Sequence, residues 1–158
     1  MTRYASNTSV SSGKSREEIE KTLSRYGADG FQYGWQGSRA QVCFLMDDRM
    51  IRFDLEMPDR NSEEFTLTPT RRHKRHPDDA TKAWEQACRQ RWRALLLVIK
   101  AKLEAVESGI TTFETEFMPY TILPSGQTVA QWLLPQVETI YTTGKVPAGL
   151  LSAPGENP

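Results

Sequence analysis

The chain has 158 residues, 38% of them hydrophobic and 25% charged, and its 20 basic and 20 acidic residues give a formal net charge of zero. This composition is typical of one globular domain, and the zero net charge argues against a general attraction to nucleic acid or to membranes. No run of about 18 apolar residues could span a bilayer, and the first segment lacks the apolar core of a signal peptide, so we expect a cytoplasmic protein.

Two amphipathic helices are predicted. Ser15 and Glu18 form a capping-box pattern, and the apolar spacing after them predicts a helix over about 16–26. Pro77 begins a much longer helical pattern that continues to Gly109, about 45 Å at 1.5 Å per residue. Its apolar stripe consists of Trp84, Cys88, Trp92, Leu95, Ile99, Leu103 and Val106.

Three segments between these helices predict strands. Segments 30–37, 39–46 and 50–57 alternate between apolar and polar residues, which is typical of strands with one buried face. Their close spacing predicts an antiparallel meander. Segment 65–68 could add a short edge strand.

The last part of the chain predicts a small helical end. Thr111 and Glu114 repeat the capping-box pattern and favour a short helix. Thr128 begins a final helix, which Pro135 is expected to kink.

The fold class is therefore α+β: a short helix, a three- to four-stranded antiparallel meander, a long helix packed on the sheet, and a small C-terminal helical end. We expect a disordered tail over 1–13, a single domain over 14–144, and an extended or disordered tail over 145–158. Cys43 and Cys88 lie outside any metal-type spacing and are expected to be reduced, buried thiols.

The most suggestive charged feature is a basic loop that leads into a basic helix edge. At 100° per residue, the cations of the long helix fall within about 40° of one another, beside the apolar stripe. Such an edge could bind phosphates, but Glu85 and Glu104 stand at spacings that could pair with it and leave an ordinary solvated face. The candidate phosphate contacts are Arg71, Arg72, Lys74, Arg75, Lys82, Arg89, Arg93 and Lys100.

Aromatic residues share one face of the first strand. Phe31, Tyr33 and Trp35 could stack unpaired bases, although large aromatics on the apolar side of a strand are more often core. If these aromatics belong to the core, the outward-facing residues would be Gln32, Gln36, Arg39 and Gln41.

Metal and catalytic patterns are weak. His73 and His76 are flanked by cations, which oppose a metal ion. Asp54 and Glu56 share a strand face but lack the following lysine of magnesium-dependent nucleases, and no nucleophile motif or phosphate loop is present. We therefore predict no catalytic residue, no metal and no cofactor. Further carboxylates gather around the end of the long helix: Glu104, Glu107, Glu114 and Glu116.

Three runs resemble a small uncharacterised family encoded by tailed phages and prophages: "KSREEIEKTLSRYGADGFQYGW", "LPSGQTVAQWLLPQV" and, most specifically, "WRALLLVIKAKLEAVESG". The resemblance implies a phage or prophage setting and carries over no catalytic residue. The order of elements is also that of double-stranded RNA binding domains, which is an analogy of fold only.

These observations favour a non-enzymatic, nucleic-acid-associated accessory protein that contacts the phosphates of a single or double strand. The rival hypothesis is a protein–protein interaction module, oligomeric or directed at a host factor, that uses the last helix and the segment "VPAGLL". An enzyme with an unrecognised carboxylate site is a third hypothesis.

Overall fold

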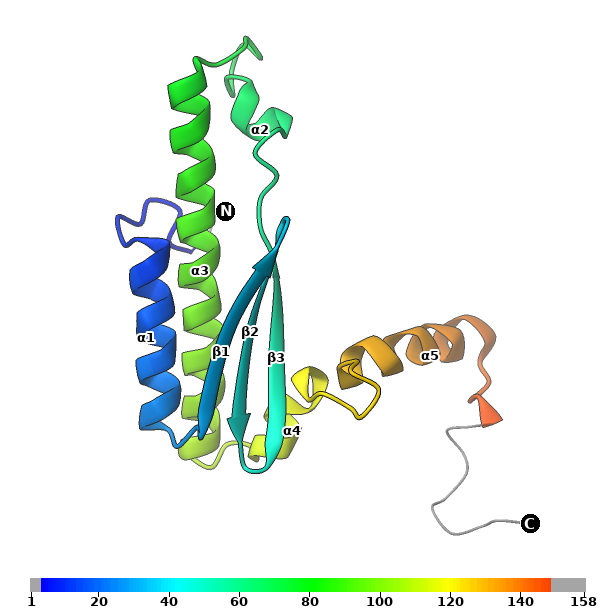
Figure 1. The fold of residues 1–158 in the computed structure, drawn as a ribbon. Coiled ribbons are helices and arrows are strands. Elements are labelled where there is room, and N and C mark those ends of the chain that lie inside the picture. Colours follow the sequence, from blue (N-terminus) through cyan, green and yellow to red (C-terminus); the bar gives the residue numbers. More distant parts are fainter. Residues whose placement is uncertain (1–3, 149–158) are drawn as a thin grey trace, which may run out of the picture.

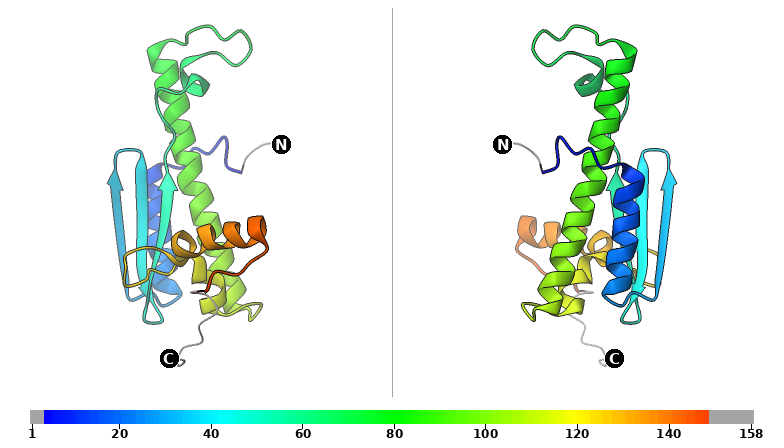
Figure 2. Two further views of the ribbon diagram at one scale, coloured as in Figure 1. Left: turned by 90° about the vertical axis from the view of Figure 1, so that its right-hand side faces the viewer. Right: turned by 90° about the vertical axis from the view of Figure 1, so that its left-hand side faces the viewer.

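The computed structural model describes residues 4–148 and shows an α+β fold (Figure 1). One three-stranded antiparallel sheet, ordered β1-β2-β3, carries α1 and α3 on the same face, side by side (Figure 2). The elements are α1 (Ser12–Arg25), β1 (Gly30–Gln36), β2 (Arg39–Met46), β3 (Arg49–Glu56), α2 (Glu63–Thr66), α3 (Pro77–Glu107), α4 (Phe113–Phe117), the 3-10 helix η1 (Met118–Tyr120) and α5 (Val129–Thr143).

Helix α1 begins one turn earlier than the sequence pattern predicted. Its N-cap is Ser11, whose hydroxyl accepts a hydrogen bond from the Lys14 amide at 3.1 Å. The predicted cap, Ser15, is instead a fully buried residue inside the helix. The capping-box interpretation of Ser15 was therefore wrong, because Ser11 satisfies the free amides of the first turn.

The predicted three-stranded antiparallel meander is present. Val42 in the central strand lies opposite Tyr33 in β1 and Phe53 in β3. Asp47 and Asp48 connect β2 to β3 with positive φ angles of 49° and 56°, the backbone that a tight two-residue hairpin needs. A turn of this kind matches the right-handed twist of the two strands that it joins. β2 and β3 therefore turn one common face toward the helices.

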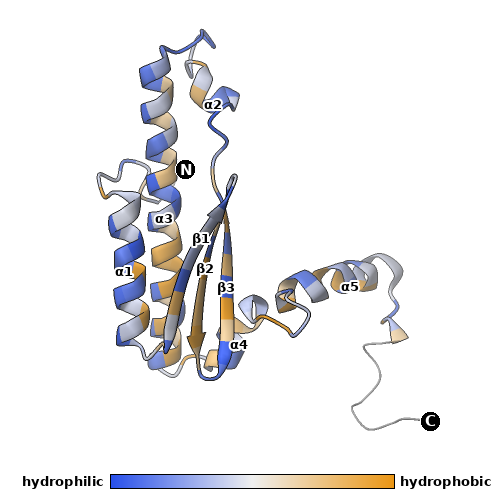
Figure 3. Cartoon of the chain, in the orientation of Figure 1, coloured by the Kyte–Doolittle hydropathy of each residue, from blue (hydrophilic) through white to orange (hydrophobic). Residues whose placement is uncertain are grey.

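The core lies between the sheet and one half of α3. At 31 residues α3 is about 46 Å long, whereas strands of seven or eight residues reach at most about 27 Å. Its buried residues begin only at Cys88, and they continue through Ile99 to Leu103. Figure 3 shows the same division, with apolar colour on the half of α3 beside the sheet and polar colour at its other end.

Beyond the sheet, α2 lies against the first half of α3, and the basic loop leads into that helix (Figure 1). The predicted edge strand over 65–68 does not form: Phe65 and Thr66 belong to α2, and Leu67 makes only an isolated bridge to Lys74. The hydrophobic side chain of Phe65 is buried, so the segment packs through a helical turn. We call residues 58–87 the tip.

At the opposite end of α3, α4 and η1 close the core. The N-cap of α4 is Thr112, one residue after the predicted Thr111, and its hydroxyl accepts a hydrogen bond from the Thr115 amide. Phe117 is completely buried and meets Phe44 and Phe53 edge-on, at ring-centroid distances of 5.9 and 6.4 Å.

Helix α5 begins at the predicted residue. Thr128 and Gln131 form a complete capping box, and Gly144 ends the helix in the left-handed conformation. The helix projects away from the sheet and has no buried residue (Figure 1). Pro135 lies inside it.

Among the described residues, no helix combines the length and apolar character needed to cross a membrane.

Candidate functional site

The basic loop forms a closed turn at the tip. Its backbone is tied by hydrogen bonds from the Thr68 amide to the His73 carbonyl and from the Arg75 amide to the Thr66 carbonyl. Arg72 is ion-paired with Glu63, and the Arg75 guanidinium donates to the Leu67 carbonyl. Two of the four candidate loop cations are thus used to hold the loop.

The basic helix edge is divided in a similar way. Arg93 donates to Glu18 of α1 at 2.7 Å, and both side chains are largely covered. Arg89 donates to Gln86, whose own amide holds the carbonyls of Ser6 and Thr8. The middle of the edge therefore binds α1 and the segment before it, and does not face solvent as a continuous cationic surface.

Four candidate phosphate contacts are both exposed and unpaired among the described residues: Arg71, Lys74, Lys82 and Lys100. Within residues 4–148 their side chains make no hydrogen bond or ion pair. The first three belong to the tip, while Lys100 lies eighteen residues after Lys82 along α3, about 27 Å away. Acidic residues of the tip match its basic ones in number: Asp59, Glu63, Glu64, Asp78, Asp79 and Glu85 against Arg60, Arg71, Arg72, Lys74, Arg75 and Lys82.

The aromatic face of β1 is only partly core. Phe31 packs against the core, and the Tyr33 ring meets Trp92 of α3 edge-on at 5.3 Å. Trp35, two residues further along the same face, is 72% exposed. The outward-facing residues are exposed as expected, namely Gln32, Gln36, Arg39 and Gln41.

Trp35 lines a cavity of about 300 Å³ between the first turns of α1, the β1–β2 turn and the middle of α3. Trp84 and Trp92 of α3 form further aromatic walls, and Arg16 of α1 lies over the Tyr33 and Trp92 rings at 4.6 and 5.4 Å. We call this cavity the aromatic pocket. The sequence indicated its rings separately but not their meeting, because they come from distant parts of the chain.

Among the described residues, the thiols and carboxylates show no arrangement typical of catalysis. Cys43 and Cys88 are both free, and burial raises the pKa of each thiol, so neither is an activated nucleophile at neutral pH. Glu104 accepts a hydrogen bond from the Tyr26 hydroxyl at 2.9 Å, which raises the pKa of Tyr26. Within residues 4–148, no three His, Cys, Asp or Glu side chains come together as a possible metal site.

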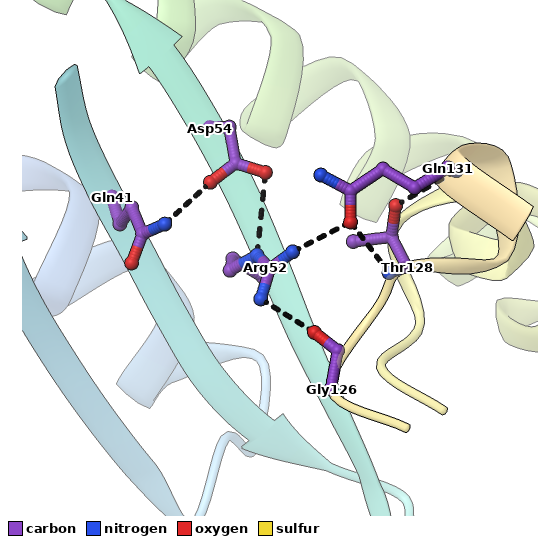
Figure 4. Close-up of polar contacts among 6 residues, drawn as sticks. All are labelled: Gln41, Arg52, Asp54, Gly126, Thr128 and Gln131. Carbon is purple, nitrogen blue, oxygen red and sulfur yellow. Dashed lines mark hydrogen bonds and ion pairs between the residues drawn. The ribbon is translucent and has the colours of Figure 1, made fainter. Parts of the chain in front are cut away.

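The root of α5 is fixed by a polar network on the open face of the sheet (Figure 4). Arg52 of β3 donates to Asp54 at 3.2 Å, to the Gly126 carbonyl at 3.0 Å and to Gln131 at 2.8 Å. Only 16% of the Arg52 side chain is exposed, and Gln131 also accepts from the Thr128 amide. This role of Arg52 could not be read from the local sequence, because Gly126 and Gln131 lie more than seventy residues away.

Beyond its root, α5 presents a wide apolar face. At 100° per residue, seven apolar side chains fall within about 140° of the helix circumference. They are Val129, Ala130, Leu133, Leu134, Val137, Ile140 and Tyr141. None is buried, and Leu134 and Tyr141 are 64% and 86% exposed. Residues 149–158, which include part of the "VPAGLL" segment, lie outside the described structure.

Comparison with protein-family models, with curated proteins and with solved structures gave no match to this chain. The resemblance to a phage and prophage family therefore stays a prediction.

Proposed function

We propose that the protein is an interaction module that pairs with a second copy of itself through α5. The observation that carries this proposal is a fifteen-residue helix with an apolar face and no buried residue. Two of its seven apolar side chains, Leu134 and Tyr141, are largely exposed, and the other five are half-buried. An exposed apolar patch is typical of interaction sites. The two free thiols are consistent with a reducing cytoplasm as the place of action.

The anchoring of α5 supports a docking role. A helix that merely lacked a place to pack would need no fixed root, whereas Arg52 and the capping box hold this one at a defined position. A projecting helix held in this way requires little ordering when it binds.

The charge of α5 favours a second copy as the partner. Glu138 is the only charged residue in the helix, so the apolar face presents no pattern of charge that would select an oppositely charged protein. A two-fold symmetric pair uses the same patch on both chains and here sets at most one carboxylate against another. The tyrosine and leucine side chains can then cover each other.

Sedimentation equilibrium over a range of concentrations tests the pairing. We expect a dimer whose stability changes little with salt, because the contact is apolar. Replacing Leu134→Glu together with Tyr141→Glu should leave a folded monomer, since both carboxylates would enter the contact.

The matched control carries Thr139→Glu and Thr142→Glu on the polar side of α5, where both residues are exposed, and should remain dimeric. A wild-type chain that stays monomeric, or a dimer unaffected by the first pair of changes, would contradict self-pairing and leave a different protein as the partner.

A second candidate function is contact with nucleic-acid phosphates at the tip. It is favoured by the exposed and unpaired side chains of Arg71, Lys74 and Lys82, which a strand could reach together. The equal number of tip carboxylates opposes tight binding, so we expect weak affinity with strong salt dependence.

The change Lys74→Ala with Lys82→Ala should weaken binding to single and double strands alike and reduce the slope of log affinity against log salt by about two. Fluorescence anisotropy with labelled oligonucleotides measures both quantities. Lys21→Ala is the control, because Lys21 is exposed but paired with Glu17. An unchanged slope in the double variant would show that the tip does not contact phosphates.

A further inference from the structure

The aromatic pocket has a composition that the packing of the core does not explain. On the same strand face Phe31 packs against the core and Tyr33 is 37% exposed, whereas Trp35, which lines the cavity, is 72% exposed. Burying a tryptophan ring is strongly favourable, so a largely exposed one beside a cavity is typical of a binding surface.

The pocket is also cationic. Arg16 and Arg39 both line it, and none of its lining residues is an aspartate or glutamate. Within the described chain, Arg16 makes its only hydrogen bond to the Tyr33 hydroxyl, at 3.3 Å, and neither arginine is in an ion pair. Glu56 is the register partner of Arg39 in β3.

This combination limits the chemistry of a ligand. A cavity lined by aromatic rings can bind an ammonium group. Here two arginines line the cavity without a carboxylate, and their positive charge opposes the binding of a cation. At about 300 Å³ the cavity is at the small end of ligand sites, which suits a single planar ring system. The pocket therefore fits a flat apolar group that carries an anionic group beside it.

We propose that the aromatic pocket binds one unpaired base of a single-stranded nucleic acid, stacked on Trp35, with the neighbouring phosphate held by Arg16. Every base has a face that can stack on tryptophan, and a paired base in a duplex does not expose that face. The proposed base site is separate from α5. It specifies for the second candidate function which form of nucleic acid is bound.

A third arginine extends the cationic surface along the path of a strand. The Arg60 guanidinium lies over the Trp84 ring at 5.5 Å and donates to the Thr81 hydroxyl, with no carboxylate partner in residues 4–148. Because Trp84 lines the pocket, a strand with one base inserted could place a following phosphate near Arg60.

Anisotropy with a labelled DNA single strand of about 15 nucleotides, its duplex and a strand of equal length without bases tests the proposal. We expect the single strand to bind most tightly. Trp35→Ala should weaken that binding about ten-fold, and Trp35→Phe should retain most of it because a ring remains. Arg16→Gln should weaken binding and lower its salt dependence.

The matched control is Trp132→Ala, which removes an exposed tryptophan from α5 and should leave binding unchanged. The tip variant Lys74→Ala with Lys82→Ala affects single and double strands alike, whereas Trp35→Ala should affect only the single strand, so failure of either site can be recognised separately.

Three outcomes would overturn the base pocket: equal binding of the strand without bases, unchanged binding by Trp35→Ala, or no binding of any strand. A free nucleoside monophosphate that bound as tightly as the strand would overturn the strand as the ligand. An acidic peptide that bound where no strand did would identify the pocket as a protein-docking site and contradict the proposal.

Discussion

Replacing Phe117 by alanine is expected to lower the free energy of unfolding by about 3–5 kcal/mol. Phe117 is completely buried and contacts the rings of Phe44, Phe53 and Phe113. Removing its ring leaves a cavity that two strands and α4 cannot easily close. In a chain of this size the loss corresponds to a fall in melting temperature of roughly 10 °C.

Thermal and denaturant unfolding followed by circular dichroism measures the effect. Met118→Ala is the matched control, because this neighbouring side chain is 49% exposed and its loss should change stability by less than about 0.5 kcal/mol. Similar stability of the two variants would mean that α4 does not close the core as described.

Replacing Arg52 by alanine is expected to release the root of α5 without unfolding the sheet. The change removes hydrogen bonds to the Gly126 carbonyl and to Gln131 and leaves Asp54 with Gln41 alone (Figure 4). Hydrogen bonds to a charged group contribute about 1.5–3 kcal/mol each, so amide hydrogen exchange in 121–135 should become at least about ten-fold faster.

Hydrogen exchange followed by mass spectrometry resolves this segment from the strands, whose protection should not change. Arg52→Lys should restore little, because an ammonium group cannot reproduce the three-way geometry of the guanidinium. The control is Arg49→Ala, since Arg49 is exposed and bonds only to the Asp48 carbonyl within the described residues. Unchanged exchange in the Arg52→Ala variant would assign the rigidity of this segment to its backbone contacts with β3.

The hydrophobic periodicity and the capping patterns predicted those elements well whose structure is determined by a single segment of the chain. The alternation in 39–46 follows from local sequence and is present as predicted. The predicted stripe of α3 is buried from Cys88 to Leu103, whereas its two ends, Trp84 and Val106, are only half-buried. The position of the α1 cap was missed because Ser11 and Ser15 are equally good caps in isolation. Only packing, which buries Ser15 completely, decides between them.

The surfaces depend on contacts that no single segment contains. Spacing predicted that Glu85 could meet Arg89, and these side chains lie 4.0 Å apart. Spacing could not predict that Arg93 would be bound by Glu18 of α1, 75 residues away. The aromatic pocket is likewise assembled from α1, the sheet and α3, so its rings were visible in the sequence but their cavity was not.

The overhang of α3 beyond the sheet has a consequence for how the protein opens. Because its first buried residue is Cys88, the turns from Pro77 to Ala87 can fray without disrupting the core. The cost of such partial melting rises along the helix toward the sheet. A partner that binds this end of α3 would slow its local unfolding. A protease would cleave the chain there before it cleaves anywhere in the sheet.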